Sequence, residues 1–337
     1  HAYAYAYAHA YAHAYAYAYA YAYAYAYALL ASAALLLALV ATAPVSVLSP
    51  TACRVRNLDT ATTRASLQQA VGAARAGDRL TVRGVCRGTT RIGKDLTIRG
   101  VRTATSGKPI LDGAMRGTVV VVRGGVRVTL RQLTLRRGEA QAGGAILNQG
   151  TLILRDVIVR ASTAAYGGGV YNSPGAILRL NGSSSIRGNA TVGPTGASDG
   201  SALPQHHPGA VYHLSGACGD ARQGTPDVAG GGVLNGGTLI LNGSSSISGN
   251  RTGMSAGGVY NAGILTLNDS GSISRNTAGT TGGGVYNVGT LTMAGSSSIS
   301  GNTATGYDGG GVCNLGDLSG VVCGDNVHDN TPDDCAP

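Results

Sequence analysis

Residues 282–302 read GGGVYNVGTLTMAGSSSISGN, and closely similar lines stand at residues 230–250 and 256–276. Each copy holds paired glycines, one asparagine, a short aliphatic run and a serine-rich segment. Self-similarity at a fixed period indicates a repeat architecture and takes precedence over any single motif. The asparagine after the glycines recurs every 24 to 27 residues except across one longer gap, at Asn148, Asn172, Asn235, Asn261, Asn287 and Asn314.

One repeat unit contains three short extended segments, which in the clearest copy are residues 285–286, 290–293 and 298–300. About 26 residues are too few for three hairpins, but they suffice for one coil of a parallel β-helix. In that fold each strand pairs with its equivalent about 4.8 Å away in the next coil. The pattern therefore predicts an all-β, right-handed, three-sheet parallel β-helix (solenoid) over residues 53–337, with an N-terminal capping helix.

Alternation within each segment predicts which side chains face inward. Three aliphatic columns are expected inside, and the repeated asparagines are expected to form a ladder of amide hydrogen bonds between coils. The flanking glycines are expected to make turns at positive φ that other residues cannot make. The predicted columns are Leu178, Leu180, Leu239, Leu241, Leu265, Leu267, Leu291 and Met293; Ile186, Ile247, Ile273 and Ile299; and Val170, Val233, Val259, Val285 and Val312.

Both ends carry capping signals. Residues 66–78 predict an amphipathic helix with a capping box between Ser66 and Gln69 and an end at Gly77, within an N-terminal cap over residues 53–86. The polar segment 315–337 predicts a C-terminal cap. A helix over the first coil would shield an open strand edge.

The long gap between Asn172 and Asn235 suggests a degenerate repeat. The segment GAVYHLSGACGD, residues 209–220, places His213 where the asparagine is expected. The excess length then falls in residues 191–208, which we interpret as a loop insertion. His206, His207 and His213 are better explained by a surface loop than by a metal site.

The amino-terminal segment and the six cysteines indicate export. Residues 29–52 contain an apolar run of signal-peptide length, which is short for a membrane span. Residues 1–28 are a tract of Ala alternating with Tyr or His, which we interpret as a translated DNA microsatellite or a disordered segment; the alternative is an aggregation-prone strand. No CxxC pair supports zinc, so we predict disulfides Cys53–Cys86 and Cys323–Cys335, leaving Cys218 and Cys313 open.

Two motifs carry a family resemblance. GGAI at residues 143–146 and ISGNTA or ISRNTA at residues 299–304 and 273–278 resemble the repeat pair of chlamydial polymorphic outer-membrane proteins, with Ile where that family favours Phe. The arrangement over residues 53–335 also resembles secreted parallel β-helix proteins of actinobacteria in the pectin-lyase-like superfamily. The resemblance implies a secreted or cell-surface rod, in some cases adhesive.

Charge divides the chain into a basic and an acidic half. Residues 54–137 hold eighteen Lys and Arg against four Asp and Glu, a net charge of +14, and residues 138–337 hold seven against twelve, a net charge of −5. The basic half suits an anionic glycan or cell-wall polymer. Nucleic acid is disfavoured because no DNA- or RNA-binding motif accompanies the charge. The alternative is a solvated face that keeps a rod soluble. Candidate ligand-binding residues are Arg127, Arg131, Arg136 and Arg155, with Tyr171, Tyr212, Tyr260 and Tyr286 as an outward aromatic column.

Catalysis has weaker support in the sequence. β-Helix lyases and hydrolases need acids clustered on adjacent coils, whereas the acids here are scattered. The candidates are Asp112, Glu139 and Asp156, with Arg131 as a basic partner. We therefore expect a binding or adhesive protein, with a polysaccharide lyase or glycosidase as the alternative and a purely structural rod as a third possibility. No cofactor or metal is predicted, and the oligomeric state is open.

Overall fold

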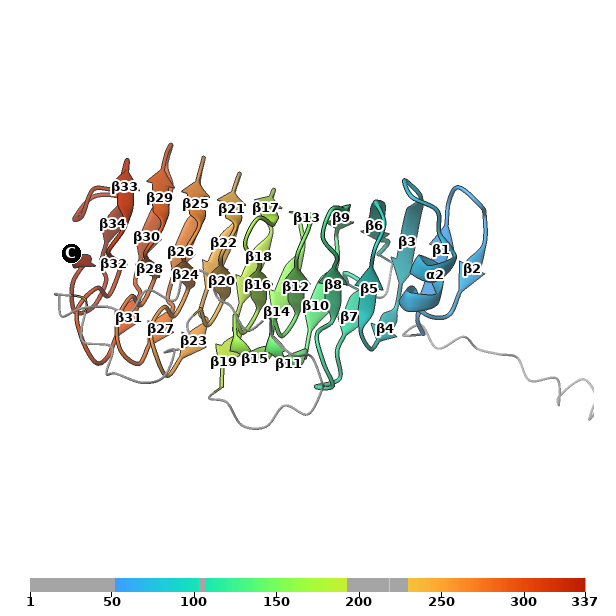
Figure 1. Cartoon of the computed structure of the whole chain (residues 1–337), viewed down its shortest axis with the longest axis horizontal. Coiled ribbons are helices and arrows are strands. Elements are labelled where there is room, and N and C mark those ends of the chain that lie inside the picture. The colour runs from blue at the N-terminus through green and yellow to red at the C-terminus, as the bar shows by residue number, and fades with distance from the viewer. Residues whose placement is uncertain (1–51, 103–106, 193–217, 219–229, 337) are drawn as a thin grey trace, which may run out of the picture. The chain divides into compact units, whose positions relative to one another are not determined.

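The computed structural model describes residues 52–102, 107–192, 218 and 230–336. They belong to one compact unit, Pro50–Pro337. Its strands stack side by side along a single axis as a parallel β-solenoid of about eight turns (Figure 1). The all-β parallel β-helix and the amino-terminal helix predicted from the repeat are confirmed.

Three sheets run the length of the solenoid, and we call them A, B and C. A fourth, shorter sheet covers six coils, so the predicted three-sheet cross-section holds only at the two ends. The strands of sheet A are β4 (Val85–Arg87), β7 (Ile110–Asp112), β10 (Thr134–Arg136), β14 (Ile158–Arg160), β18 (Ser185–Arg187), β22 (Ser246–Ser248), β26 (Ser272–Ser274), β30 (Ser298–Ser300) and β34 (Val327–His328).

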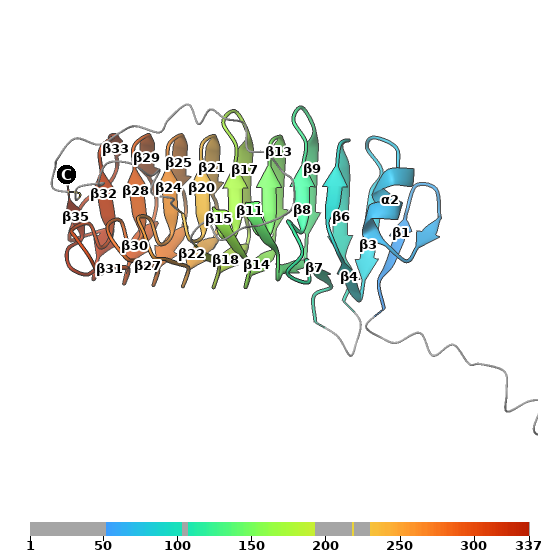
Figure 2. The same ribbon diagram turned by 60° about the horizontal axis from the view of Figure 1, so that its bottom comes forward.

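Sheet B is the widest, and Figure 2 shows its strands in succession. Its strands are β2 (Thr63–Arg64), β1 (Arg54–Asn57), β3 (Arg79–Arg83), β6 (Leu96–Gly100), β9 (Arg127–Arg131), β13 (Thr151–Arg155), β17 (Ile177–Asn181), β21 (Thr238–Leu241), β25 (Ile264–Leu267), β29 (Thr290–Met293) and β33 (Asp317–Ser319).

Sheet C and the short sheet complete each coil. Sheet C contains β5 (Thr90–Ile92), β8 (Val120–Val122), β12 (Ile146–Asn148), β16 (Val170–Asn172), β20 (Val233–Asn235), β24 (Val259–Asn261), β28 (Val285–Asn287), β32 (Val312–Asn314) and β35 (Cys335–Ala336). The short sheet contains β11 (Glu139–Ala142), β15 (Thr163–Tyr166), β19 (Ala190–Thr191), β23 (Arg251–Thr252), β27 (Thr277–Ala278) and β31 (Thr303–Ala304).

The predicted aliphatic columns form the core. Leu178 lies beside Leu239, Ile186 beside Ile247, and Val170 beside Val233. All three predicted columns are buried, and they join one continuous hydrophobic cluster that reaches the cap helix. A solenoid this narrow therefore needs no large aromatic side chain at its centre.

The amino-terminal cap differs in detail from the prediction. Helix α2 (Leu67–Ala73) is shorter than residues 66–78, and the N-cap residue Ser66 makes no side-chain capping bond, so the capping box is wrong. The helix instead buries Leu67, Ala70 and Val71 against the core. The edge of sheet B is covered by the antiparallel strands β1 and β2.

The gap between Asn172 and Asn235 hides no repeat. Asn172 and Asn235 are paired in adjacent strands of sheet C, and the Asn172 Nδ2 donates to the Asn235 Oδ1 at 2.7 Å. The whole segment between β19 and β20 is therefore one insertion within a single coil, longer than residues 191–208. His206, His207, His213 and most of this segment lie outside the described residues, as do residues 1–51.

All three cysteine pairs form disulfides. Cys53–Cys86 and Cys323–Cys335 are paired as predicted, and the two cysteines left open are joined as Cys218–Cys313. Cys218 thus connects the insertion to β32, which lies three coils beyond β20, the strand that follows the insertion.

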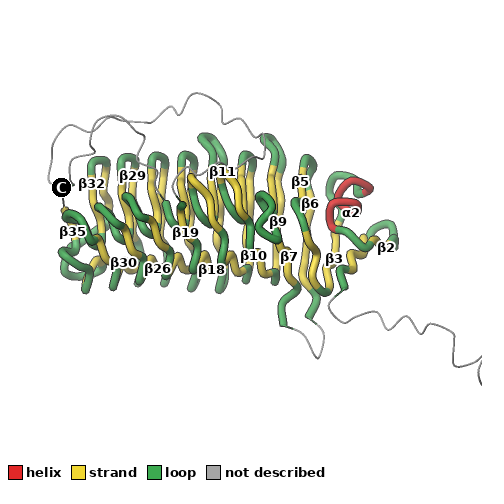
Figure 3. Tube along the Cα trace, turned by 90° about the horizontal axis from the view of Figure 1, so that it is seen from below, coloured by secondary structure: helices red, strands yellow, loops and turns green. Residues whose placement is uncertain are grey.

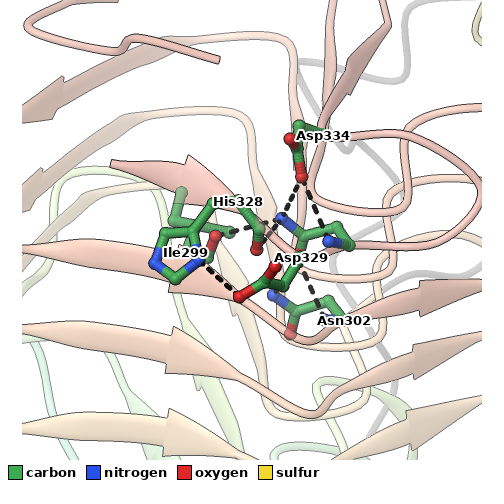
Figure 4. Close-up of polar contacts among 6 residues, drawn as sticks. Ile299, Asn302, His328, Asp329 and Asp334 are labelled. Atoms are coloured by element: carbon green, nitrogen blue, oxygen red, sulfur yellow. Dashed lines mark hydrogen bonds and ion pairs between the residues drawn. The ribbon is translucent and has the colours of Figure 1, made fainter. Parts of the chain in front are cut away.

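Two asparagine ladders run inside the solenoid. The predicted one continues without a break from Asn148 to Asn314, with amide contacts of 2.7 to 2.8 Å. A second one, not predicted, joins Asn189, Asn250, Asn276, Asn302 and Asn330. At its last step the Asn330 Oδ1 accepts a hydrogen bond from the Asn302 Nδ2, and the Asn330 Nδ2 donates to the main-chain oxygen of Ile299 and to Asp334. Figure 4 shows Asn302, Ile299 and Asp334 around this point.

Several corners of the coils have a residue other than glycine at positive φ, where glycine was expected. After every strand of sheet A except β7, the next residue takes positive φ, and this position holds glycine in four coils and Arg137, Ala161, Arg275 or Asp329 in the others. A single left-handed residue costs only about 1–2 kcal/mol, so a well-paired coil tolerates it. Glycine is required where coils approach closely: a Cβ on Gly283 would collide with the Gly310 oxygen of the next coil.

We expect Asn261→Ala to lower the free energy of unfolding by about 1–3 kcal/mol, because the buried Asn287 Oδ1 loses its donor and the Asn235 Nδ2 loses one of its acceptors. The matched control is Asn268→Ala, whose amide donates to Asn242 on the partly exposed outside of a corner. That change should cost less than about 1 kcal/mol. Chemical denaturation measures both, and equal costs would contradict a stabilising role for the inner ladder.

Candidate polyanion-binding face

Sheet A places arginines above one another on its outer face. Arg136 pairs in register with Arg160, and Arg160 pairs with Arg187, in three consecutive coils. Two coils earlier the same position holds Arg87, and Asp112 stands between. Beyond Arg187 the position continues as Ser248, Ser274 and Ser300. We call Arg87, Arg136, Arg160 and Arg187 the arginine column.

Asp112 is the acid within this column. Its side chain is fully buried and contacts Arg136 Nε at 3.0 Å and Arg137 Nη2 at 2.9 Å. Burial alone would raise the pKa of the Asp112 carboxyl. Hydrogen bonds from Arg137, from the Ala114 N–H and from Arg136 outweigh that effect and hold the pKa below its usual range. Asp112 is therefore charged at neutral pH and paired with Arg136 and Arg137.

The rest of the column is not neutralised by the described residues. Arg87, Arg160 and Arg187 form no ion pair or side-chain hydrogen bond with this part of the chain. Like charges directly opposite one another on neighbouring strands are destabilising. The arginines on this face therefore repel one another, and a bound anion would reduce that repulsion.

A lysine from another coil adds to the same positive potential. Lys108 reaches from the segment before β7 to the main-chain oxygen of Asp156, two coils away, at 2.6 Å. Burial lowers the pKa of Lys108, and repulsion from Arg102 and Arg187 lowers it further. The positive field of the face therefore affects a neighbouring ammonium group.

The predicted ligand-binding arginines divide between two faces. Arg136 belongs to sheet A, whereas Arg131 and Arg155 lie in register on the outside of sheet B together with Arg99. Arg127 begins β9, four residues before Arg131, and its backbone N–H donates to Asp95. Sequence reasoning missed Arg87, Arg160 and Arg187, although Arg136, Arg160 and Arg187 follow the coil period in the sequence.

The candidate catalytic acids do not come together. Asp112 is buried in sheet A, Glu139 is exposed on the short sheet, and Asp156 lies at a corner at positive φ. The backbone N–H of Ser183 lowers the pKa of Asp156, whose carboxylate also accepts the Ser183 hydroxyl. Within the described ranges, no three His, Cys, Asp or Glu side chains gather closely enough to hold a metal ion. Arg131, the basic partner suggested for these acids, lies in sheet B, and Asp112 forms an ion pair with Arg136 instead.

The tyrosine column is outward from the coil but not exposed. Tyr171 and Tyr286 are each only 6% exposed, and the rings of Tyr260 and Tyr286 stack with centroids 5.6 Å apart. Burial raises the pKa of Tyr286 to about 12. Tyr286 packs with the Cys218–Cys313 disulfide. An open aromatic platform is therefore wrong for Tyr171 and Tyr286, and Tyr212 lies outside the described residues.

The fold defines the protein as a parallel β-solenoid with three disulfides. Comparison with family models, with curated proteins and with solved structures found no match to the chain. Among the described residues, no helix combines the length and the apolar character needed to span a bilayer.

We expect Asp112→Asn to destabilise the protein by about 2–3 kcal/mol at neutral pH, because the buried carboxylate loses the charge-assisted hydrogen bonds that it accepts from the partly exposed Arg136 and Arg137. Since the folded pKa of Asp112 is lowered, its contribution is present above about pH 4 and is lost as the pH falls through the folded pKa. The variant should therefore show a shallower loss of stability in acid. Urea denaturation at several pH values measures this, with the exposed Glu139→Gln as control; an unchanged acid slope in Asp112→Asn would contradict the assignment.

Proposed function

We propose that this protein is a secreted or cell-surface β-solenoid that binds an anionic polymer, such as an acidic glycan or cell-wall polymer, along the arginine column of sheet A. The observation that carries the proposal is the in-register stacking of Arg136, Arg160 and Arg187, the last two of which have no acidic partner among the described residues. Guanidinium groups suit carboxylate, sulfate or phosphate because each can donate two parallel hydrogen bonds.

A polymer fits this arrangement better than a small anion. The column from Arg87 to Arg187 crosses four coil steps of about 4.8 Å, which gives a length of about 19 Å. A ligand with anionic groups along a line can contact several guanidinium groups at once, and linked contacts gain from a high effective concentration. The side chains suit a chain lying parallel to the solenoid axis.

Two further features support a glycan-like partner outside the cell. Three disulfides are typical of proteins that work in an oxidising compartment. Aromatic side chains on which bases could stack are absent from the arginine column itself, which favours a polyanion without bases. Separated and hydrogen-bonded carboxylates favour binding over cleavage, because glycosidases need a facing pair of carboxyl groups.

The test compares Arg160→Gln plus Arg187→Gln with the control Arg251→Gln plus Arg275→Gln, which removes the same charge from exposed arginines outside the column. On immobilised polygalacturonate and alginate, we expect the first pair to weaken binding about tenfold and to lower the slope of log affinity against log salt by about one to two. Neither the parent protein nor the two double variants should bind neutral dextran.

Equal losses in both double variants, or no retention of the parent protein on any anionic glycan, would overturn the proposal. The same incubations, with and without Ca²⁺, also test the enzymatic alternative. New reducing or unsaturated ends in the glycan would show that the protein cleaves it, and the proposal of a binding protein would give way to that of a lyase or glycosidase.

A further inference from the structure

Apolar side chains are exposed to solvent at the carboxyl-terminal end of the solenoid. Strand β33 is the last in sheet B and pairs with β29 alone among the described strands. Leu318 lies in register with the buried Leu291, yet it is 40% exposed. Leu315 is 38% and Val322 is 52% exposed nearby in the sequence. Exposed apolar groups at a strand edge indicate an interaction surface.

This end is also acidic. Residues 305–336 contain six Asp and no Lys or Arg, for a net charge of −6 with His neutral. Asp333 and Asp334 are used internally, where they accept backbone N–H groups of Gly309, Gly310 and Asn330. Asp308, Asp317 and Asp325 are exposed and form no ion pair with the described residues.

The amino-terminal end has the opposite charge. Residues 52–83 contain six Arg against two Asp, for a net charge of +4. Asp78 is buried against Asn57, and Asp59 pairs with Arg79 at 2.9 Å. That leaves five exposed arginines without an acidic partner in the described chain, together with Leu58, which is 47% exposed. They are Arg54, Arg56, Arg64, Arg75 and Arg83.

We propose that the solenoid associates head to tail with a second copy of itself, the acidic end of one against the basic cap of the next. Figure 3 shows the cap, with α2 and β2, and the end that holds β35 at opposite extremes of the described unit. Tail-to-tail contact would oppose two acidic surfaces, and head-to-head contact two basic ones. Only the heterologous contact brings opposite charges together, and a contact of this kind propagates into open filaments unless its rotation closes a ring.

The cap determines how the two ends meet. Helix α2 covers the core, and β2 is a two-residue edge strand, so sheet B does not continue into the next copy as an extended parallel sheet. The interface therefore consists of side chains: aspartates against arginines, and Leu315, Leu318 and Val322 against a surface that includes Leu58. Such an interface is weakened by salt, because its charges are solvent-exposed.

The test uses the full chain in sedimentation velocity over a range of concentration and salt. The parent protein should associate at low salt and dissociate at high salt. Arg64→Glu plus Arg75→Glu brings the net charge of residues 52–83 from +4 to 0, and Asp317→Lys plus Asp325→Lys brings that of residues 305–336 from −6 to −2. Each variant alone should associate at least about tenfold more weakly, and an equimolar mixture should recover association, because the acidic ends of one face the basic ends of the other.

Arg251→Glu plus Arg275→Glu is the control and should associate like the parent. Circular dichroism establishes that each variant keeps the fold before it is compared. A parent protein that stays monomeric at low salt, a mixture that fails to recover association, or an Arg64→Glu plus Arg75→Glu variant that associates by itself as strongly as the parent would each overturn the proposal. None of these outcomes depends on whether the arginine column binds a polymer.

Discussion

Each coil of this solenoid pairs with the next in register, so the buried asparagines are satisfied by the same residue in the neighbouring coils. The two inner asparagine ladders repeat one amide along the axis, each Nδ2 donating to the oxygen one coil further on. A buried amide without such a partner would cost about 1–3 kcal/mol. Stacking therefore constrains the sequence more strongly than core volume does, which is why the repeats resemble one another so closely around Asn261 and Asn287.

The same constraint explains how much of the fold could be predicted. Leu265, Ile273 and Val259 could be assigned to three inner columns because alternation and period depend only on local sequence. The second ladder could have been found, since Asn250, Asn276 and Asn302 recur every 26 residues. The long insertion could not, because a chance likeness around Cys218 suggested a coil, and only the pairing of Asn172 with Asn235 excludes it. Corners occupied by Arg137 or Asp329 rather than glycine show that pairing along a coil can outweigh a local backbone preference.

Net charge predicted the candidate site only in part, because Arg160 and Arg187 lie in residues 138–337, whose net charge is negative. Net charge identified the basic half, whereas Arg131 and Arg136, five residues apart, lie on different sheets. The residues that stand together are a coil period apart in the sequence, as Arg136 and Arg160 are. Alternation gave the correct side of the sheet for Tyr286, but its burial depends on parts of the chain that are distant in sequence, such as Cys218. A rod whose guanidinium groups repeat at the coil spacing is thus suited to recognising the spacing of charges along a polymer.

The bond between Cys218 and Cys313 also changes what happens when the chain is pulled from its two ends. It encloses a segment of 95 residues that includes the coils from β20 to β32. Tension passes through the disulfide and does not act on the residues between Cys218 and Cys313. The contour released on full extension is shortened by about 320 Å, taking about 3.4 Å per residue. The coils from β20 to β32 therefore bear no tension even after the strands from β33 to β35 have come apart.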